Sequence, residues 1–228
     1  MAINAGSTTF YQAKRGIVQD GLLLNLDAGV SQSYDGVGTT WYDLADDNNG
    51  TLTNGPTFDR ANGGSILLDG SDDFIDLGSQ VSNLSTCTVS FWINYVVFAA
   101  ANVPIGDNAL NFDLAIYFEA GNMLFQDSSG GGNTIIIPHN TINAGTWYNF
   151  MMTRGSTNVT MYQDGASLGQ AAKNNGTFKV AWIVTGKHKI IPSTSIYSIV
   201  CDNNTITASR RVLKYHISIF KIYNKIKI

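Results

Sequence analysis

The chain contains a single glutamate, Glu119, among its 228 residues. Retaining glycosidases place a pair of carboxylates on either side of one glycosidic bond, and two glutamates cannot be assembled here. An aspartate pair stays open, because two carboxylates could come from Asp46 and Asp47 or from the set Asp72, Asp73 and Asp76. These aspartates lie in turn sequences, where Asp usually accepts hydrogen bonds from nearby backbone N–H groups. We therefore expect no enzyme activity.

The sequence also lacks clustered histidines and any cysteine in a recognisable catalytic motif. The three histidines, His139, His188 and His216, are far apart in sequence, and no G-x-S-x-G elbow is present. A nucleophilic triad and a zinc site are therefore not predicted. Cys87 and Cys201 lie in separate apolar runs and are interpreted as buried free thiols, with a disulfide between them as the minority alternative.

Long hydrophobic runs are absent too. No stretch approaches the roughly 20 apolar residues of a membrane-spanning helix, so membrane insertion is not expected. The first residues contain no apolar core typical of a signal peptide, which predicts synthesis in a cytoplasm without classical export. With 44% hydrophobic and 14% charged residues, the composition favours one compact globular domain.

The net charge is −3, but the charged residues are unevenly distributed along the chain. Residues 1–179 carry 6 basic and 16 acidic side chains, a net charge of −10, whereas residues 180–228 carry 8 basic and 1 acidic, a net charge of +7. The basic-aromatic motifs of nucleic-acid recognition are missing, so nucleic acid is not an expected partner. The basic end is interpreted either as a charged edge that resists aggregation or as a dock for an acidic neighbour in an assembly.

What is abundant is short apolar runs separated by Gly, Asn and Asp. Such runs predict β-strands at residues 21–28, 65–69, 74–77, 86–97, 112–119, 134–137, 147–154 and 159–163. Alternation between residues 88 and 93 places Val89, Phe91 and Ile93 on a core face and Trp92 on the opposite face. The fold class predicted from this pattern is all-β.

Several motifs occur together in a fixed order. G-T-T-W-Y-D-L begins at Gly38, N-G-T-L-T-N-G-P follows at Asn49, and D-G-x-D-D begins at Asp69. A W-Y-x-x-x-x-T-R to Y-x-D-G hairpin comes later, and the chain closes with I-S-I-F-K-I-Y-N. The set resembles the laminin-G-like (LamG) branch of the concanavalin A-like lectin/glucanase superfamily, in the form found in structural proteins of tailed bacteriophages.

The resemblance implies a two-sheet antiparallel β-sandwich, a jelly roll, over residues 20–228, preceded by an N-terminal arm at 1–19. Residues 187–228 form an atypical basic segment that includes the closing strand, and the course of residues 187–211 is left open. In a jelly roll the closing strand at 217–223 would lie beside the first strand at 21–28.

The function that the resemblance implies is that of a bacteriophage virion structural or accessory protein: a capsid decoration, head-fibre or tail-fibre component. Its location would be the virion, its partners other virion subunits, and its assembly a homo-oligomer. A stand-alone carbohydrate-binding adhesin module for host-surface polysaccharide is the second hypothesis, and it can coexist with the first. A glycan-cleaving enzyme is third.

Candidate site residues follow from these hypotheses. Aromatic rings that stack on sugars are expected among Trp41, Tyr42 and Trp92, although Trp41 is favoured as a structural residue. Calcium, the one cofactor considered, prefers oxygen-rich loops, and the candidates are Asp46, Asp47, Asp72 and Asp73. The candidates for assembly contacts lie in the arm and the basic end: Phe10, Tyr11, Lys14, Arg15, Arg210, Arg211 and Lys214.

Overall fold

The computed structural model describes residues 19–94, 102–106, 114–119, 122–127, 133–137, 142–173, 178–185 and 196–200. The candidate assembly contacts in the arm and the basic end lie outside these residues, as do Cys201 and the closing strand at 217–223. Among the described residues, no helix has the length and apolar character needed to cross a membrane.

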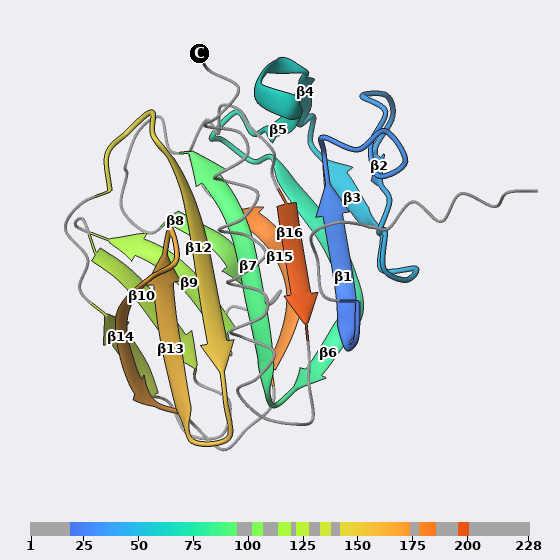
Figure 1. Cartoon of the computed structure of the whole chain (residues 1–228). Helices are drawn as coiled ribbons and strands as arrows, with labels where there is room; N and C mark the ends of the chain where they lie inside the picture. Colours follow the sequence, from blue (N-terminus) through green and yellow to red (C-terminus); the bar gives the residue numbers. More distant parts are fainter. Residues whose placement is uncertain are drawn as a thin grey trace, which may run out of the picture.

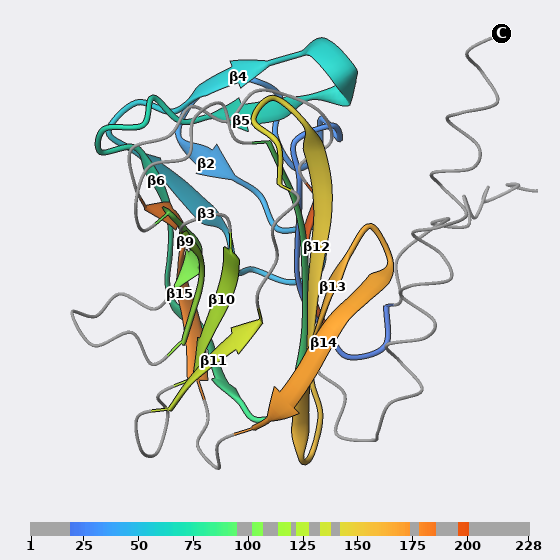
Figure 2. The ribbon, with the colours of Figure 1, turned by 90° about the vertical axis from the view of Figure 1, so that its left-hand side faces the viewer.

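Two antiparallel sheets face each other (Figures 1 and 2). The six-stranded sheet has the order β1 (Leu22–Asp27), β16 (Ile196–Val200), β7 (Cys87–Asn94), β12 (Trp147–Arg154), β13 (Asn158–Gln163) and β14 (Ala166–Ala172). The eight-stranded sheet has the order β11 (Asn133–Ile137), β10 (Asn122–Asp127), β9 (Leu114–Glu119), β8 (Asn102–Gly106), β15 (Phe178–Thr185), β6 (Phe74–Leu84), β3 (Gly50–Thr53) and β2 (Thr40–Trp41). The predicted all-β antiparallel sandwich is confirmed.

A small hairpin closes one end of the sandwich. Strands β4 (Thr57–Asp59) and β5 (Ser65–Leu67) pair with each other, and a short 3-10 turn, η1 (Ala61–Gly63), lies between them. Figure 2 shows this hairpin lying across the upper ends of both sheets. We refer to it as the end hairpin.

The core forms where the two sheets turn their apolar faces toward each other. On β7, Val89, Phe91 and Ile93 are almost completely buried, as the alternation predicts. Phe91 pairs in register with Phe150 of β12, and the centroids of their rings lie 6.0 Å apart. Cys87 is buried and takes part in no disulfide, in agreement with the prediction for this residue.

The predicted hairpin of β12 and β13, and the tight turn that follows it, are also confirmed. Asp164 and Gly165 both have positive φ, 49° and 82°, which is the backbone of a type I′ turn. This turn continues the right-handed twist of the strands, so β14 follows β13 at the edge of the six-stranded sheet. The Asp164 carboxylate accepts a hydrogen bond from the Asn149 N–H at 2.9 Å, which ties the turn to β12.

The first strand, β1, pairs with β16, which comprises residues 196–200. The predicted neighbour, the strand at 217–223, lies outside the described residues, so its place near β1 stays a prediction. β16 lies within the segment whose course the sequence left open, and it completes the ladder from β1 to β7. Within the described residues, β16 is thus the strand that joins β1 to the rest of the six-stranded sheet.

The backbone of the end hairpin closely approaches the backbone of the residues that follow β1. Gly64 has a φ of 106°, and a Cβ at this residue would lie within 3.0 Å of the Ala28 carbonyl oxygen. A Cβ on Gly29 would likewise meet the Gly63 carbonyl oxygen. Side chains would hold the two segments apart, so glycines are required for the hairpin to seal the core.

Gly64→Ala is expected to lower the free energy of unfolding by about 3 kcal/mol, because it adds steric overlap to an unfavourable backbone conformation. Gly145→Ala is the matched control, since Gly145 also has positive φ (75°) but no atom lies within 4 Å of the place that its Cβ would take. The control should cost about 1 kcal/mol. Equal losses in urea unfolding of the two variants would show that the close approach does not matter.

Candidate functional site

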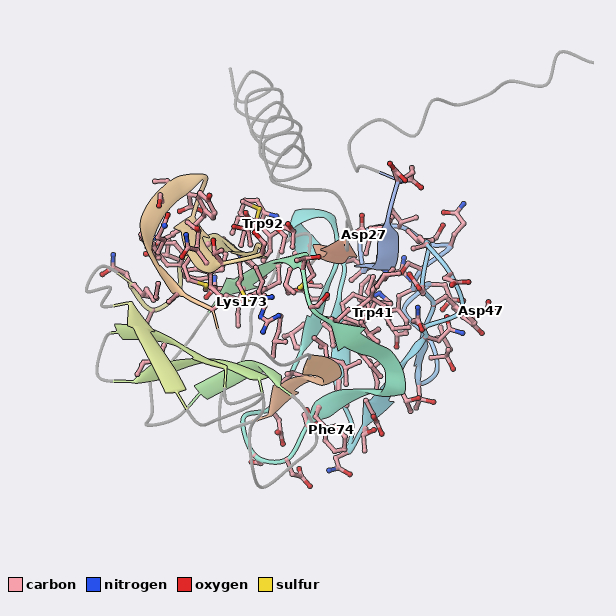
Figure 3. All side chains as sticks on the ribbon, turned by 90° about the horizontal axis from the view of Figure 1, so that it is seen from below. Asp27, Trp41, Asp47, Phe74, Trp92 and Lys173 are labelled. Atoms are coloured by element: carbon pink, nitrogen blue, oxygen red, sulfur yellow. The ribbon has the colours of Figure 1, made fainter. Side chains whose placement is uncertain are left out.

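The W-Y-D-L motif begins in the core and ends at the surface. Trp41 in β2 is completely buried, and Figure 3 shows it between the two sheets. The structural role favoured for Trp41 is therefore borne out, whereas its alternative role as a glycan-stacking residue is contradicted, because the ring has no exposed surface. Tyr42, the next residue, is 54% exposed and remains available for contact.

Asp43 organises the loop that follows. Its carboxylate accepts hydrogen bonds from four backbone N–H groups: those of Asn25 (2.7 Å), Ala45 (2.9 Å), Asp46 (3.1 Å) and Asn48 (3.3 Å). A carboxylate that accepts this many backbone hydrogen bonds holds the loop in one conformation. The aspartate of the motif thus has a local structural role, which is turn formation.

The same loop covers the free edge of β1. The Asn25 N–H donates a hydrogen bond to the Asp43 carboxylate, and the Asn25 carbonyl accepts one from the Leu44 N–H (2.9 Å). The Leu23 carbonyl accepts a hydrogen bond from the Asn48 side-chain amide (2.7 Å). Exposed strand edges invite pairing with other chains. Here the backbone groups of the edge are occupied by the loop.

Three carboxylates gather at the start of β6. Asp69, Asp72 and Asp73 place carboxylate oxygens within 4.8 Å of one another. The Asp69 N–H donates to Asp73 Oδ2 at 2.9 Å, and the Ser71 N–H donates to Asp69 Oδ1 at 2.7 Å. We call these three aspartates the carboxylate cluster. Asp72 and Asp73 were predicted as calcium ligands, and Asp69, which opens the same oxygen-rich D-G-x-D-D loop, joins them in the structure.

The predicted aspartates do not form one site. Asp46 and Asp47 are exposed and lie outside the carboxylate cluster, in the loop that Asp43 organises. A calcium site at Asp46 and Asp47 stays a prediction. The oxygen ligands that calcium prefers are concentrated instead at the carboxylate cluster.

The electrostatics of the cluster are unfavourable for three negative charges. Burial raises the pKa of the Asp73 carboxyl above its ordinary value of 3.8. The hydrogen bond from the Asp69 N–H lowers this pKa, and the charges of Asp69 and Asp72 raise it again. A bound cation would reverse this balance by stabilising the ionised carboxylates.

Because the pKa of Asp73 is higher in the folded protein than in the unfolded chain, its contribution to stability is fully present below pH 3.8 and falls as the pH rises through the folded-state pKa. Asp73→Asn keeps an acceptor for the Asp69 N–H and removes the charge. In chelator at pH 7 this variant should be more stable by about 1 kcal/mol, the scale of one like-charge contact near 4 Å in water. Urea unfolding between pH 4 and pH 8 checks this, with Asp47→Asn as control.

We propose that the carboxylate cluster binds calcium. Calorimetric titration of chelator-treated protein should give heat and an increase in melting temperature, and Asp72→Asn and Asp73→Asn should abolish both. Asp46→Asn and Asp47→Asn should leave the titration unchanged. If only Asp46→Asn and Asp47→Asn abolish the heat of calcium binding, the metal lies in the loop that Asp43 organises. If the wild-type protein gives no heat, the proposal of calcium binding is wrong.

A second candidate surface is the outer face of the six-stranded sheet, which we define as the face that points away from the eight-stranded sheet. Alternation along the strands determines which side chains reach it. On β7, Trp92 follows the buried Phe91 and precedes the buried Ile93. Figure 3 shows Trp92 on this outer side, and its side chain is half-buried.

Polar and aromatic residues of the neighbouring strands surround Trp92. Asn149 of β12 lies opposite Trp92 in the ladder, and Trp147 lies opposite Asn94. The Asn149 side chain donates to Ser90 Oγ and to the Phe91 carbonyl, both at 3.3 Å, which fixes the orientation of its amide. Two tryptophans and two asparagines therefore alternate at one end of β7 and β12.

A further aromatic residue lies on the same face. Tyr162 of β13 is half-buried and pairs with Met151 of β12. It is two strands away from Trp92 and displaced by two residues along the strand. Standard strand geometry places the two positions about 12 Å apart, so a ligand that contacts both rings must be longer than one sugar ring.

Of the predicted glycan residues, the structure therefore places only Trp92 on this face. Tyr42 follows β2 at the far end of the other sheet. Sequence reasoning missed Asn94, Asn149 and Tyr162. The signal was present in the alternation of β7, β12 and β13, which places these three residues on the side of each strand opposite the core.

The family of the chain follows from the comparison with family models. The model described as the concanavalin A-like lectin/glucanases superfamily matches residues 69–192. The chain belongs to this superfamily. The matched region of this concanavalin A-like domain contains the carboxylate cluster and the hairpin that carries Asn149 and Tyr162. No curated protein matches the sequence.

Solved structures of low sequence identity share the fold. The binding domain of Paraclostridial Mosquitocidal Protein 1 has a TM-score of 0.61 at 16% identity, with 86% of this chain and 52% of that chain covered. The botulinum neurotoxin serotype D ligand binding domain in complex with N-acetylneuraminic acid has a TM-score of 0.62 at 13% identity, covering 89% and 52%. Domain 4 of AbnA, an extracellular arabinanase from Geobacillus stearothermophilus, in complex with arabinotriose, has a TM-score of 0.60 at 14% identity, covering 87% and 98%.

The concanavalin A-like domain spans about half the length of the two toxin binding domains. It corresponds to nearly the whole of the arabinanase domain. At these identities the likeness concerns the lectin-like fold alone, so the ligand has to be argued from the residues of this chain.

Proposed function

We propose that this chain is a carbohydrate-binding domain that holds a glycan on the outer face of the six-stranded sheet. The observation that carries the proposal is the half-buried Trp92, placed beside the Asn149 amide on that face. Sugar recognition combines an aromatic ring, which stacks on the apolar face of a pyranose or furanose, with planar amides that bind its hydroxyls. Trp92 and Asn149 provide both.

Two of the structural neighbours support this reading by analogy. One, of whose chain 52% is covered, was solved with N-acetylneuraminic acid, and the other was solved with arabinotriose. Analogy of fold raises the expectation of glycan binding but names no ligand. The polar and aromatic composition of the outer face is the independent argument.

We propose further that the domain binds without catalysis. Its single glutamate excludes a pair of glutamates, and the three carboxylates that lie together in the described residues form the carboxylate cluster. Two of those carboxylates accept hydrogen bonds from backbone N–H groups within their own turn. Such bonds support a turn or a metal site and do not provide a separated acid and nucleophile.

Trp92→Ala is expected to reduce glycan affinity at least about tenfold, because the stacking surface is removed. Tyr42→Ala is the matched control, since it removes an exposed aromatic residue from the other sheet and should leave the affinity unchanged. A glycan array followed by calorimetry on the strongest ligand provides the measurement. Thermal melting shows that both variants are folded. If no glycan is bound by the wild-type protein, or if Tyr42→Ala alone abolishes binding, the proposed site is wrong.

The narrower function, a structural or accessory protein of a bacteriophage virion, is proposed from the sequence motifs alone. Its supporting residues in the arm and the basic end lie outside the described residues. Mass spectrometry of purified particles tests it, and absence of the protein from them would leave the glycan-binding domain as the remaining reading.

A further inference from the structure

We propose that the outer face of the six-stranded sheet selects neutral, hydroxyl-rich saccharides and discriminates against saccharides that carry a carboxylate or sulfate. This inference rests on the proposed function and specifies the chemical class of its ligand. Three observations support it: two unpaired acceptors, the uncharged side chains around Trp92, and a carboxylate at one end of the face.

The first observation concerns buried acceptors without partners. Asn94 is 5% exposed and Asn25 is 8% exposed, and the side-chain Oδ1 of each is buried without a hydrogen-bond partner. Both side chains point to the outer face, because Ile93 and Leu26 beside them point into the core. Buried polar atoms are almost always paired, so two orphan oxygens on one face indicate that a further group completes them.

The chemistry of these two unpaired oxygens restricts which ligand group can pair with them. An amide oxygen only accepts, so its partner must carry a donor. A sugar hydroxyl is a donor, whereas an ionised carboxylate or sulfate group has acceptor oxygens alone. Asn94 lies two residues from Trp92 on β7, about 7 Å along the strand. A sugar stacked on the Trp92 ring would therefore have its peripheral hydroxyls near Asn94, and one of them would pair with the buried Oδ1 once that amide turns outward.

The second observation is the absence of charge around the ring. In the described parts of β7, β12 and β13, none of the outward-pointing side chains is charged. These outward-pointing side chains include Ser90, Asn94, Trp147, Asn149, Met151, Thr153 and Thr160. Acidic groups are usually recognised by Arg or Lys, and these strands present neither on the outer face.

The third observation is a carboxylate at the end of β1. Asp27 lies on the outer side in Figure 3, and only β16 separates its strand from β7. Two strand spacings correspond to about 10 Å, which is near the screening length at physiological salt. Burial raises the pKa of the Asp27 carboxyl, against the effect of a hydrogen bond from the Gly29 N–H. An anionic ligand would face this like charge without a compensating cation on β7, β12 or β13.

The experiment compares matched glycans on one array, with each neutral oligosaccharide beside its sialylated, uronic-acid or sulfated derivative. The expected binders are neutral, and addition of an anionic group should weaken binding at least about tenfold. Raising the salt from low to high concentration should change the affinity less than about twofold, because no ion pair is involved. Tighter binding of the acidic derivatives would overturn the inference while leaving the proposed function intact. If no glycan of either class binds, it is the proposed function that fails.

Two variants test the residues themselves. Asn94→Leu removes an unpaired acceptor and should keep or raise the melting temperature, because no hydrogen bond of that acceptor within the protein is lost. It should nevertheless weaken binding of the neutral ligand about fivefold to tenfold. An unchanged affinity in the folded variant contradicts the role of Asn94.

Thr160→Lys places an ammonium group on the half-exposed part of the face near Tyr162. This variant should gain affinity for acidic derivatives about tenfold in a salt-dependent manner, and Thr160→Gln, a neutral side chain of greater length, should not. If both variants leave the selectivity unchanged, charge on the outer face does not set the ligand class.

Discussion

Packing of the inner faces of β7 and β12 against the opposing sheet holds the other features of the domain in place. Phe91 and Phe150 contact each other across the ladder, and both are completely buried. Because strand side chains alternate, fixing these two residues inward also fixes Trp92 and Asn149 outward. A shift of register by one residue would exchange the core with the candidate glycan face, so the hydrophobic core and the binding surface are set by the same alternation.

Aspartate has two different roles in this domain. Asp43 satisfies four backbone donors in a loop that covers the edge of β1, and its effect is to hold the loop in one conformation. Asp73 is buried beside two other carboxylates, and its pKa is raised in consequence. The surroundings decide the role. A carboxylate among several N–H donors has its hydrogen bonds satisfied, whereas several neighbouring carboxylates favour the binding of a cation.

The two candidate surfaces are separate in the fold. The carboxylate cluster lies at the start of β6 in the eight-stranded sheet, and Trp92 lies on the outer face of the six-stranded sheet. A metal at the cluster would thus act on stability and loop order at one end of the sandwich, while ligand contact would occur on the other sheet. Binding experiments with calcium and with glycans accordingly report on different parts of the molecule.

Local sequence patterns were sufficient to predict the fold class, the core face of β7, the hairpin from β12 to β14 and two of the three cluster residues. Alternation, turn residues and short motifs act within a few positions of one another, so they can be read without knowing the fold. The pairing of β16 with β1 and the burial of Trp41 became apparent in the folded chain, as did the gathering of Asn94, Asn149 and Tyr162 on one face with Trp92. Strand order and shared faces depend on pairing between residues distant in the chain, and no local pattern encodes which distant strand will be the neighbour.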